Sequence, residues 1–240
     1  MADFLNTLIF GIYPYIALTV LAIGSIIRYD REPYTWRSGS SQLLRRKQLV
    51  WGSVLFHVGV LIVFLGHLIG LLTPIGLFDL LGISHGFKQV MAIVIGGVAG
   101  IAALIGATML AHRRLLDPRI RATSTFSDNA VILILWFQLA LGLLTIPVSL
   151  GHLDGHEMVK FMAWAQGIFT FDSAASAYVA DVNPIFKLHL FLGLTIFLLF
   201  PFTRLVHMLS APIRYVWRPG YQIVRSKNDG KAVAPRQPAM

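Results

Sequence analysis

The sequence predicts an all-α integral membrane protein, a bundle of five transmembrane helices with its N-terminus outside and its C-terminus in the cytoplasm. Composition, five long apolar segments and the distribution of basic residues lead to this prediction. Of the 240 residues, 56% are hydrophobic and only 13% are charged, whereas soluble domains carry about 25% charged residues. The chain has no cysteine, which excludes disulfides and iron–sulfur clusters bound by thiolates of this chain.

Five segments are long and apolar enough to cross a bilayer, which takes about 20 residues. They cover approximately residues 5–27, 49–72, 91–111, 130–146 and 185–209. The fourth is short before Pro147 and could tilt or extend slightly. Their hydrophobicity is continuous rather than alternating, so helices are expected and not the strands of a barrel. The first segment has no basic region before it and is therefore not expected to be a cleaved signal peptide. We assign residues 1–225 to one membrane domain and residues 226–240 to a basic cytoplasmic tail, which we expect to be disordered.

Basic residues mark one side of the predicted bundle. The loop after the first segment, the loop after the third and the C-terminal end carry Arg28, Arg31, Arg37, Arg45, Arg46, Lys47, Arg113, Arg114, Arg119, Arg121, Arg204, Arg214, Arg218, Arg225, Lys227, Lys231 and Arg236. The other side has only Lys88, Lys160 and Lys187. Because basic residues mark the cytoplasmic side, the N-terminus is placed outside and the C-terminus inside. The excess of basic residues on this side accounts for the sequence pI of about 10.2.

Four histidines lie within the second and fifth apolar segments, and their depths match in pairs. His57 and His67 lie about 12 Å and about 27 Å from the start of the second segment, at 1.5 Å per residue. The fifth segment runs the other way, with His189 near its outer end and His207 near its inner end. Antiparallel helices therefore pair His57 with His207 on the inner side and His67 with His189 on the outer side.

An ionisable side chain at membrane depth is costly and indicates a function. Two bis-histidine pairs favour two metal centres, with haem as the natural candidate, about 21 Å apart. The spacing fits imperfectly, because His57 and His67 are about 80° apart around their helix, and helix tilt or crossing must absorb that difference. The alternative interpretation is polar contacts between helices or a proton relay. Glycines beside the outer pair, at Gly66, Gly70 and Gly193, would allow a macrocycle to approach the backbone, but glycine is also common in membrane helices in general.

Lys88 stands at the outer boundary of the third segment, level with the outer histidine pair. A lysine at such a boundary can simply extend its ammonium to the membrane surface. It can equally hold a quinone carbonyl or accept a quinol proton. The residues alone leave both interpretations open.

Several short stretches resemble the gamma subunit of membrane-bound respiratory nitrate reductase. They are IYPYI at 12–16, RYD at 28–30, YTWR at 34–37, LFH at 55–57, GH at 66–67, LTP at 72–74, RIRAT at 119–123, GLLTIP at 142–147 and FPFTRLVH at 200–207. The resemblance runs from about residue 4 to residue 224. That family is a five-helix diheme cytochrome b of the bacterial inner membrane with its N-terminus outside.

The resemblance implies specific site residues, cofactors and partners. His57 and His207 would ligate the proximal haem b iron, and His67 and His189 the distal one. Lys88 would belong to the quinol site beside the distal haem, with menaquinol or ubiquinol as substrate. The partners would be an iron–sulfur beta subunit and a molybdenum catalytic alpha subunit on the cytoplasmic face, where we expect residues 214–225 to dock.

Two other functions compete with a quinol-oxidising nitrate reductase subunit. One is a quinone-coupled cytochrome b subunit of another oxidoreductase, such as a sulfur-metabolism complex. The other is a haem-free membrane anchor or a proton-path transporter. A haem spectrum of the purified protein would exclude the haem-free anchor and the transporter. The absence of such a spectrum would exclude both cytochrome b functions.

Overall fold

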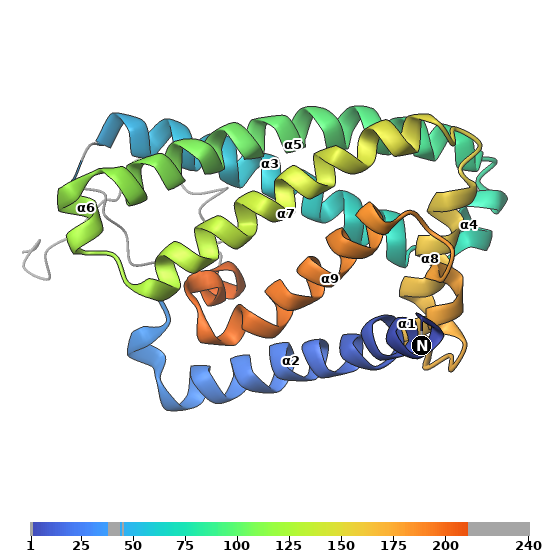
Figure 1. The fold of residues 1–240 in the computed structure, drawn as a ribbon, viewed down its shortest axis with the longest axis horizontal. Helices are drawn as coiled ribbons and strands as arrows, with labels where there is room; N and C mark the ends of the chain where they lie inside the picture. The colour runs from blue at the N-terminus through green and yellow to red at the C-terminus, as the bar shows by residue number, and fades with distance from the viewer. Residues whose placement is uncertain (1, 38–43, 45, 211–240) are drawn as a thin grey trace, which may run out of the picture. The chain divides into compact units, whose positions relative to one another are not determined.

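The computed structural model describes residues 2–37, 44 and 46–210. Every regular element in these ranges is helical (Figure 1). Five helical stretches are long and apolar enough to cross a membrane: Asp3–Arg31, Arg46–Leu72, His85–Leu116, Phe126–Leu150 and Pro184–Phe202. The predicted all-α fold with five spans is therefore confirmed. Residues Met1–His207 form one compact unit.

The first span is a composite of α1 (Ala2–Thr7), a π-helical turn η1 (Leu8–Ile12) and α2 (Tyr13–Arg31). Pro14 has no N–H, so it cannot donate to the carbonyl of Phe10 four residues earlier. The indole nitrogen of Trp164, on the distant helix α8 (His156–Thr170), donates to that carbonyl at 2.9 Å instead. Pro14 thus leaves the Phe10 carbonyl of the first span without its helical donor, and a side chain from another helix supplies the missing hydrogen bond.

Local sequence signals define where the next helices begin. The hydroxyl of Ser84 accepts from the Phe87 N–H at the start of α5 (His85–Leu116). At the start of α7 (Phe126–Leu150), the Thr125 hydroxyl and the Asp128 carboxylate exchange hydrogen bonds with each other's backbone N–H groups. Such caps satisfy donors that have no partner within the helix. The short helices α4 (Ile75–Leu80) and α6 (Pro118–Ala122) lie in the connections on either side of α5.

Two spans differ from their approximate expected bounds near a proline: the fourth extends and the fifth helix ends early. The fourth span continues through Pro147 to Leu150, because a membrane helix tolerates the loss of one backbone hydrogen bond. The fifth helix, α9 (Pro184–Leu199), ends ten residues before the expected residue 209. Pro201 cannot donate to Phe197, whose carbonyl accepts from the Phe200 N–H instead. The chain continues as two 3₁₀ segments, η4 (Phe200–Phe202) and η5 (Arg204–Ser210).

Glycine allows α3 (Arg46–Leu72) to pack closely along α5. A Cβ at Gly59 would stand 2.5 Å from the Ala99 carbonyl oxygen, and one at Gly106 would stand 2.4 Å from the Phe56 nitrogen. No side chain fits at such distances, so the two backbones touch directly. This contact fixes the helix that carries His57 and His67.

The segment between α7 and α9 contains a helix and a 3₁₀ turn, α8 and η3 (Ala175–Val179). Trp164, Ile168 and Val179 belong to one buried cluster with Phe10 of the first span and Phe186 of α9. The Gln166 amide of α8 donates to the carbonyls of Leu71 and Thr73, at 3.0 and 2.9 Å, where α3 ends. This segment therefore joins the ends of the first, second and fifth spans.

Candidate functional site: two facing histidine pairs

The four membrane histidines face one another as their depths predict. Helix α3 packs along α5, whereas α9 packs against α2 and α7. His57 of α3 and His207 of η5 have ring centroids 6.3 Å apart. His67 of α3 and His189 of α9 have ring centroids 6.1 Å apart. The histidine pairs are thus contacts between α3 and the chain segment that begins with α9.

The separation within each pair fits two axial ligands of one metal ion. An imidazole nitrogen binds a metal at about 2.0 Å and lies roughly 1.2 Å from its ring centroid, so two opposed ligands place their centroids about 6.4 Å apart. The observed separations are 6.3 and 6.1 Å. Each pair therefore has the spacing that bis-histidine ligation of a haem iron requires.

Three of the four imidazoles are oriented by a carbonyl of their own segment. The Nδ1 of His57 lies 2.7 Å from the Ser53 carbonyl oxygen, and that of His67 lies 2.8 Å from the Val63 carbonyl oxygen. The Nδ1 of His207 bonds to the Arg204 carbonyl. A neutral imidazole that donates from Nδ1 presents a bare Nε2, the usual arrangement of a metal-ligating histidine. This hydrogen bonding fits a metal-ligating role for these three histidines, independently of the ring separations.

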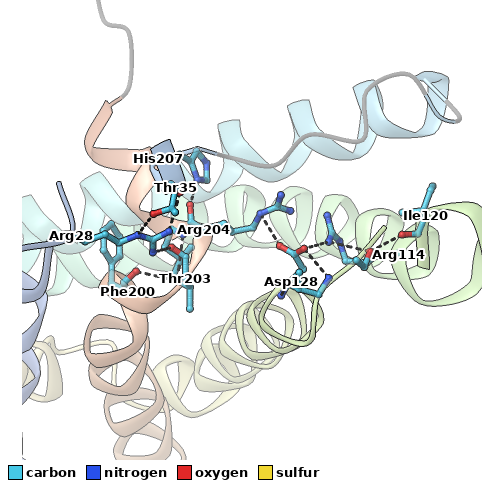
Figure 2. A network of polar contacts seen from close by, with 12 residues as sticks. Arg28, Thr35, Arg114, Ile120, Asp128, Phe200, Thr203, Arg204 and His207 are labelled. Atoms are coloured by element: carbon cyan, nitrogen blue, oxygen red, sulfur yellow. Dashed lines mark hydrogen bonds and ion pairs between the residues drawn. The ribbon is translucent and has the colours of Figure 1, made fainter. Parts of the chain in front are cut away.

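His207 stands on a 3₁₀ segment that polar contacts tie to the first span (Figure 2). The guanidinium of Arg28 donates to the carbonyls of Pro201 and Thr203, at 2.7 and 2.8 Å. These two hydrogen bonds hold the 3₁₀ segment that carries His207 against the end of the first span.

A carboxylate of α7 holds the start of the same 3₁₀ segment. Asp128 forms ion pairs with Arg204 at 3.2 Å and with Arg114 of α5 at 3.1 Å (Figure 2). The fold therefore fixes the segment bearing His207 from two neighbouring spans. Sequence analysis missed Arg28 and Asp128, because their partners are backbone carbonyls and arginines far along the chain.

His189 is placed differently, against α7. The amide nitrogen of Gln138 lies 3.1 Å from the His189 carbonyl oxygen and 3.5 Å from its Nε2. A Cβ at Gly142 would stand 3.0 Å from Cε1 of the same ring. Sequence analysis did not predict Gln138 as part of the site. The available signal was a lone carboxamide within the apolar run of residues 130–144.

The glycines near the outer pair differ in what surrounds them. A Cβ at Gly66 or Gly70 would meet no other described residue within 4 Å, which is consistent with close approach of a macrocycle. Gly193 was expected to serve the same purpose. Its Cβ would instead stand 3.2 Å from the Gln138 amide nitrogen, so Gly193 makes room for that carboxamide.

Lys88 lies in the first turn of α5 and is only 8% exposed. Its ammonium is 2.9 Å from the sulfur of Met162 on α8 and 3.5 Å from the centroid of the Phe78 ring on α4. Among the residues that the structure describes, no carboxylate forms an ion pair with it. A thioether and a ring face are weak partners for an ammonium, so the group retains donors for a further acceptor.

Five apolar spans that hold two facing histidine pairs define a multi-pass membrane protein of the cytochrome b type. The match to known proteins is more specific. The family model described as nitrate reductase gamma subunit matches residues 6–227. The chain belongs to the nitrate reductase gamma subunit family, whose members are haem-containing membrane subunits of an oxidoreductase complex.

Curated relatives agree with this family over nearly the whole chain. The respiratory nitrate reductase 1 gamma chain of Escherichia coli (strain K12) is 49% identical over 226 residues, which cover 94% of this chain and 100% of that protein. The respiratory nitrate reductase 2 gamma chain of the same organism is 50% identical, covering 95% and 100%. The nitrate reductase gamma chain of Bacillus subtilis (strain 168) is 39% identical, covering 92% and 98%.

Proposed function

We propose that this chain is the quinol-oxidising diheme subunit of a respiratory nitrate reductase in the bacterial inner membrane. It would oxidise quinol on the periplasmic side and deliver the electrons to partner subunits on the cytoplasmic side. Family membership and the two facing histidine pairs support this function. The histidine pairs are the main support, because they would supply two sets of haem ligands at two depths of one membrane protein.

Each histidine pair would hold one haem b. His57 and His207 would bind the inner haem through Nε2, and His67 and His189 the outer one. Haem b supplies one-electron redox chemistry, and two such groups across a bundle suit a two-electron donor such as quinol. The helix backbone keeps His57 and His67 about 15 Å apart along α3.

Lys88 would bind quinol, whether menaquinol or ubiquinol, beside the outer pair. Its ammonium can hydrogen-bond a quinone oxygen, and its neutral amine can accept a quinol proton as the electrons leave. Burial of Lys88 against Phe78 and Met162 supports this role over that of a lysine whose charge extends to the membrane surface.

The partners would be the iron–sulfur beta subunit and the molybdenum catalytic alpha subunit, bound on the cytoplasmic face. The names of the relatives, which call them gamma chains of nitrate reductase, support association with other subunits. The segment 214–225, which we expect to contact those subunits, lies outside the described residues. Nitrate reduction itself would take place on the alpha subunit.

Haem stoichiometry tests the proposed function. Pyridine haemochrome analysis of the purified wild-type complex should give two b haems per copy of this chain. His57→Ala or His207→Ala should remove the inner haem alone, and His67→Ala or His189→Ala the outer one alone. One haem or none in the wild type would reject the proposal.

His152 provides a matched control for those substitutions. Its ring is exposed and lies just beyond the end of α7, where its hydrogen-bond partner within the described residues is the Val148 carbonyl, at 3.2 Å. His152→Ala should therefore keep both haems, which would show that loss of a haem follows from the position of the histidine and not from its removal as such.

A further inference from the structure

The outer histidine His189 differs from the other three in how its ring is held. Each of the others bonds through Nδ1 to a carbonyl three or four residues earlier. The Nδ1 of His189 is buried, with no hydrogen-bond partner among the residues that the structure describes. Gln138 of α7 approaches this ring from the side of its other nitrogen, with its amide nitrogen 3.5 Å from Nε2.

The Gln138 carboxamide also has an unused atom. Its nitrogen donates to the His189 carbonyl, but its buried oxygen Oε1 has no partner within the described part of the chain. Buried polar atoms are almost always paired. A metal-ligating imidazole needs an acceptor for its second N–H, and an amide oxygen is such an acceptor. The two unpaired atoms therefore lie on contacting side chains and are chemically complementary.

Glycine makes this contact possible from both helices. A Cβ at Gly193, one turn after His189, would stand 3.2 Å from the Gln138 amide nitrogen. A Cβ at Gly142, one turn after Gln138, would stand 3.0 Å from the His189 ring. Each helix thus leaves space for the functional side chain of the other, and larger residues at either position would separate them.

We propose that Gln138 is the positioning residue of the outer haem ligand: once Nε2 of His189 is bound to iron, the Gln138 carboxamide turns from Nε2 to Nδ1, accepts its N–H and fixes the plane of that imidazole. This inference rests on the proposed function. Hydrogen bonding to the second nitrogen raises the basicity of a ligating imidazole and orients its ring. Gln138 therefore sets the reduction potential of the outer haem, while the inner haem depends on carbonyls of its own segments.

Potentiometric titration of the two haems tests this role, with the low-spin electron paramagnetic resonance signal of each haem as a second readout. Gln138→Met keeps the length and volume of the side chain and removes both hydrogen bonds. The reduction potential of the outer haem should shift by at least about 59 mV, which for one electron is a tenfold change in the ratio of reduced to oxidised haem. The resonance signal of this haem should also change. The inner haem should titrate as in the wild type.

Thr108→Val is the matched control. Thr108 accepts from the Trp136 indole at 2.9 Å, so this variant also removes a side-chain hydrogen bond between two spans without touching a histidine. It should leave both potentials unchanged. Loss of the outer haem alone in Gln138→Met would also support the proposal. An unchanged outer haem, or equal effects on both haems, would overturn it while leaving the proposed function intact; a wild type without two haems would reject the proposed function.

Discussion

At the scale of single residues, the chemistry of the site depends on what each polar group is bonded to within an apolar bundle. His57 and His67 take their orientation from their own helix, four residues back. His189 contacts a carboxamide on α7, and Lys88 a sulfur and an aromatic ring. The histidines therefore differ among themselves, and from Lys88, in the chemical groups that hold their side chains.

The variant Lys88→Ala should keep both haems, because Lys88 is no proposed ligand. Reduction of the haems by quinol should slow by about 100-fold or more, since general acid–base groups contribute at least that much. Stopped-flow spectroscopy with a quinol analogue measures this rate.

An artificial donor that reduces the catalytic subunit directly provides the control for Lys88→Ala. Nitrate reduction with that donor should proceed at the wild-type rate in the same preparation. Wild-type kinetics with quinol would instead assign Lys88 to an ordinary membrane-boundary lysine.

At the scale of elements, the helices are held by two kinds of contact. Glycines bring the backbones of α3 and α5 together, and polar side chains tie the 3₁₀ segments after α9 to α2 and α7. Both contacts act on segments that carry histidines. Helix packing therefore determines the geometry of the site.

Gly106→Ala should destabilise the bundle by about 1–3 kcal/mol, because the added methyl overlaps the backbone of Phe56 and forces the helices apart. Gly59→Ala should act similarly. Thermal unfolding of the detergent-solubilised complex, followed by haem absorbance, measures the effect. Gly96, also on α5, has no described neighbour within 4 Å of its Cβ position, so Gly96→Ala should be neutral or slightly stabilising.

Arg28→Met should loosen the segment that bears His207. The variant loses two hydrogen bonds from a charged donor to the Pro201 and Thr203 carbonyls, and each such bond contributes about 1.5–3 kcal/mol. We expect partial loss of the inner haem with the outer haem retained, as measured by haem content and potentiometric titration. Arg31, exposed one turn further along the same helix, is the matched control, and equal behaviour of Arg28→Met and Arg31→Met would contradict the prediction.

At the scale of the whole molecule, the unequal distribution of basic residues predicts orientation in the membrane. Ala122 lies in the connection after the third span and Ser173 in the connection after the fourth, and both residues are exposed. They are therefore expected on opposite sides of the membrane. Since the chain has no cysteine of its own, a single introduced cysteine is the only thiol of this subunit. Ser173→Cys should react with a membrane-impermeant thiol reagent in whole cells, and Ala122→Cys only after permeabilisation. The reverse pattern would place the N-terminus inside.

The sequence by itself determined the five helices and the pairing of the histidines. Continuous apolar runs specify membrane helices because the bilayer requires every backbone group to be bonded within its segment. The fixed rise of a helix then sets depth, so His57 and His207, and likewise His67 and His189, could be paired from residue numbers alone. Family membership was also visible in short local motifs.

Only the tertiary structure decided how those residues are held. The expectation of one helix over residues 185–209 is wrong, because α9 ends at Leu199 and His207 reaches His57 from a 3₁₀ segment. Gln138 beside His189, and Phe78 and Met162 around Lys88, come from helices distant in the chain. Periodicity describes one helix at a time, whereas these contacts depend on how separate helices pack together.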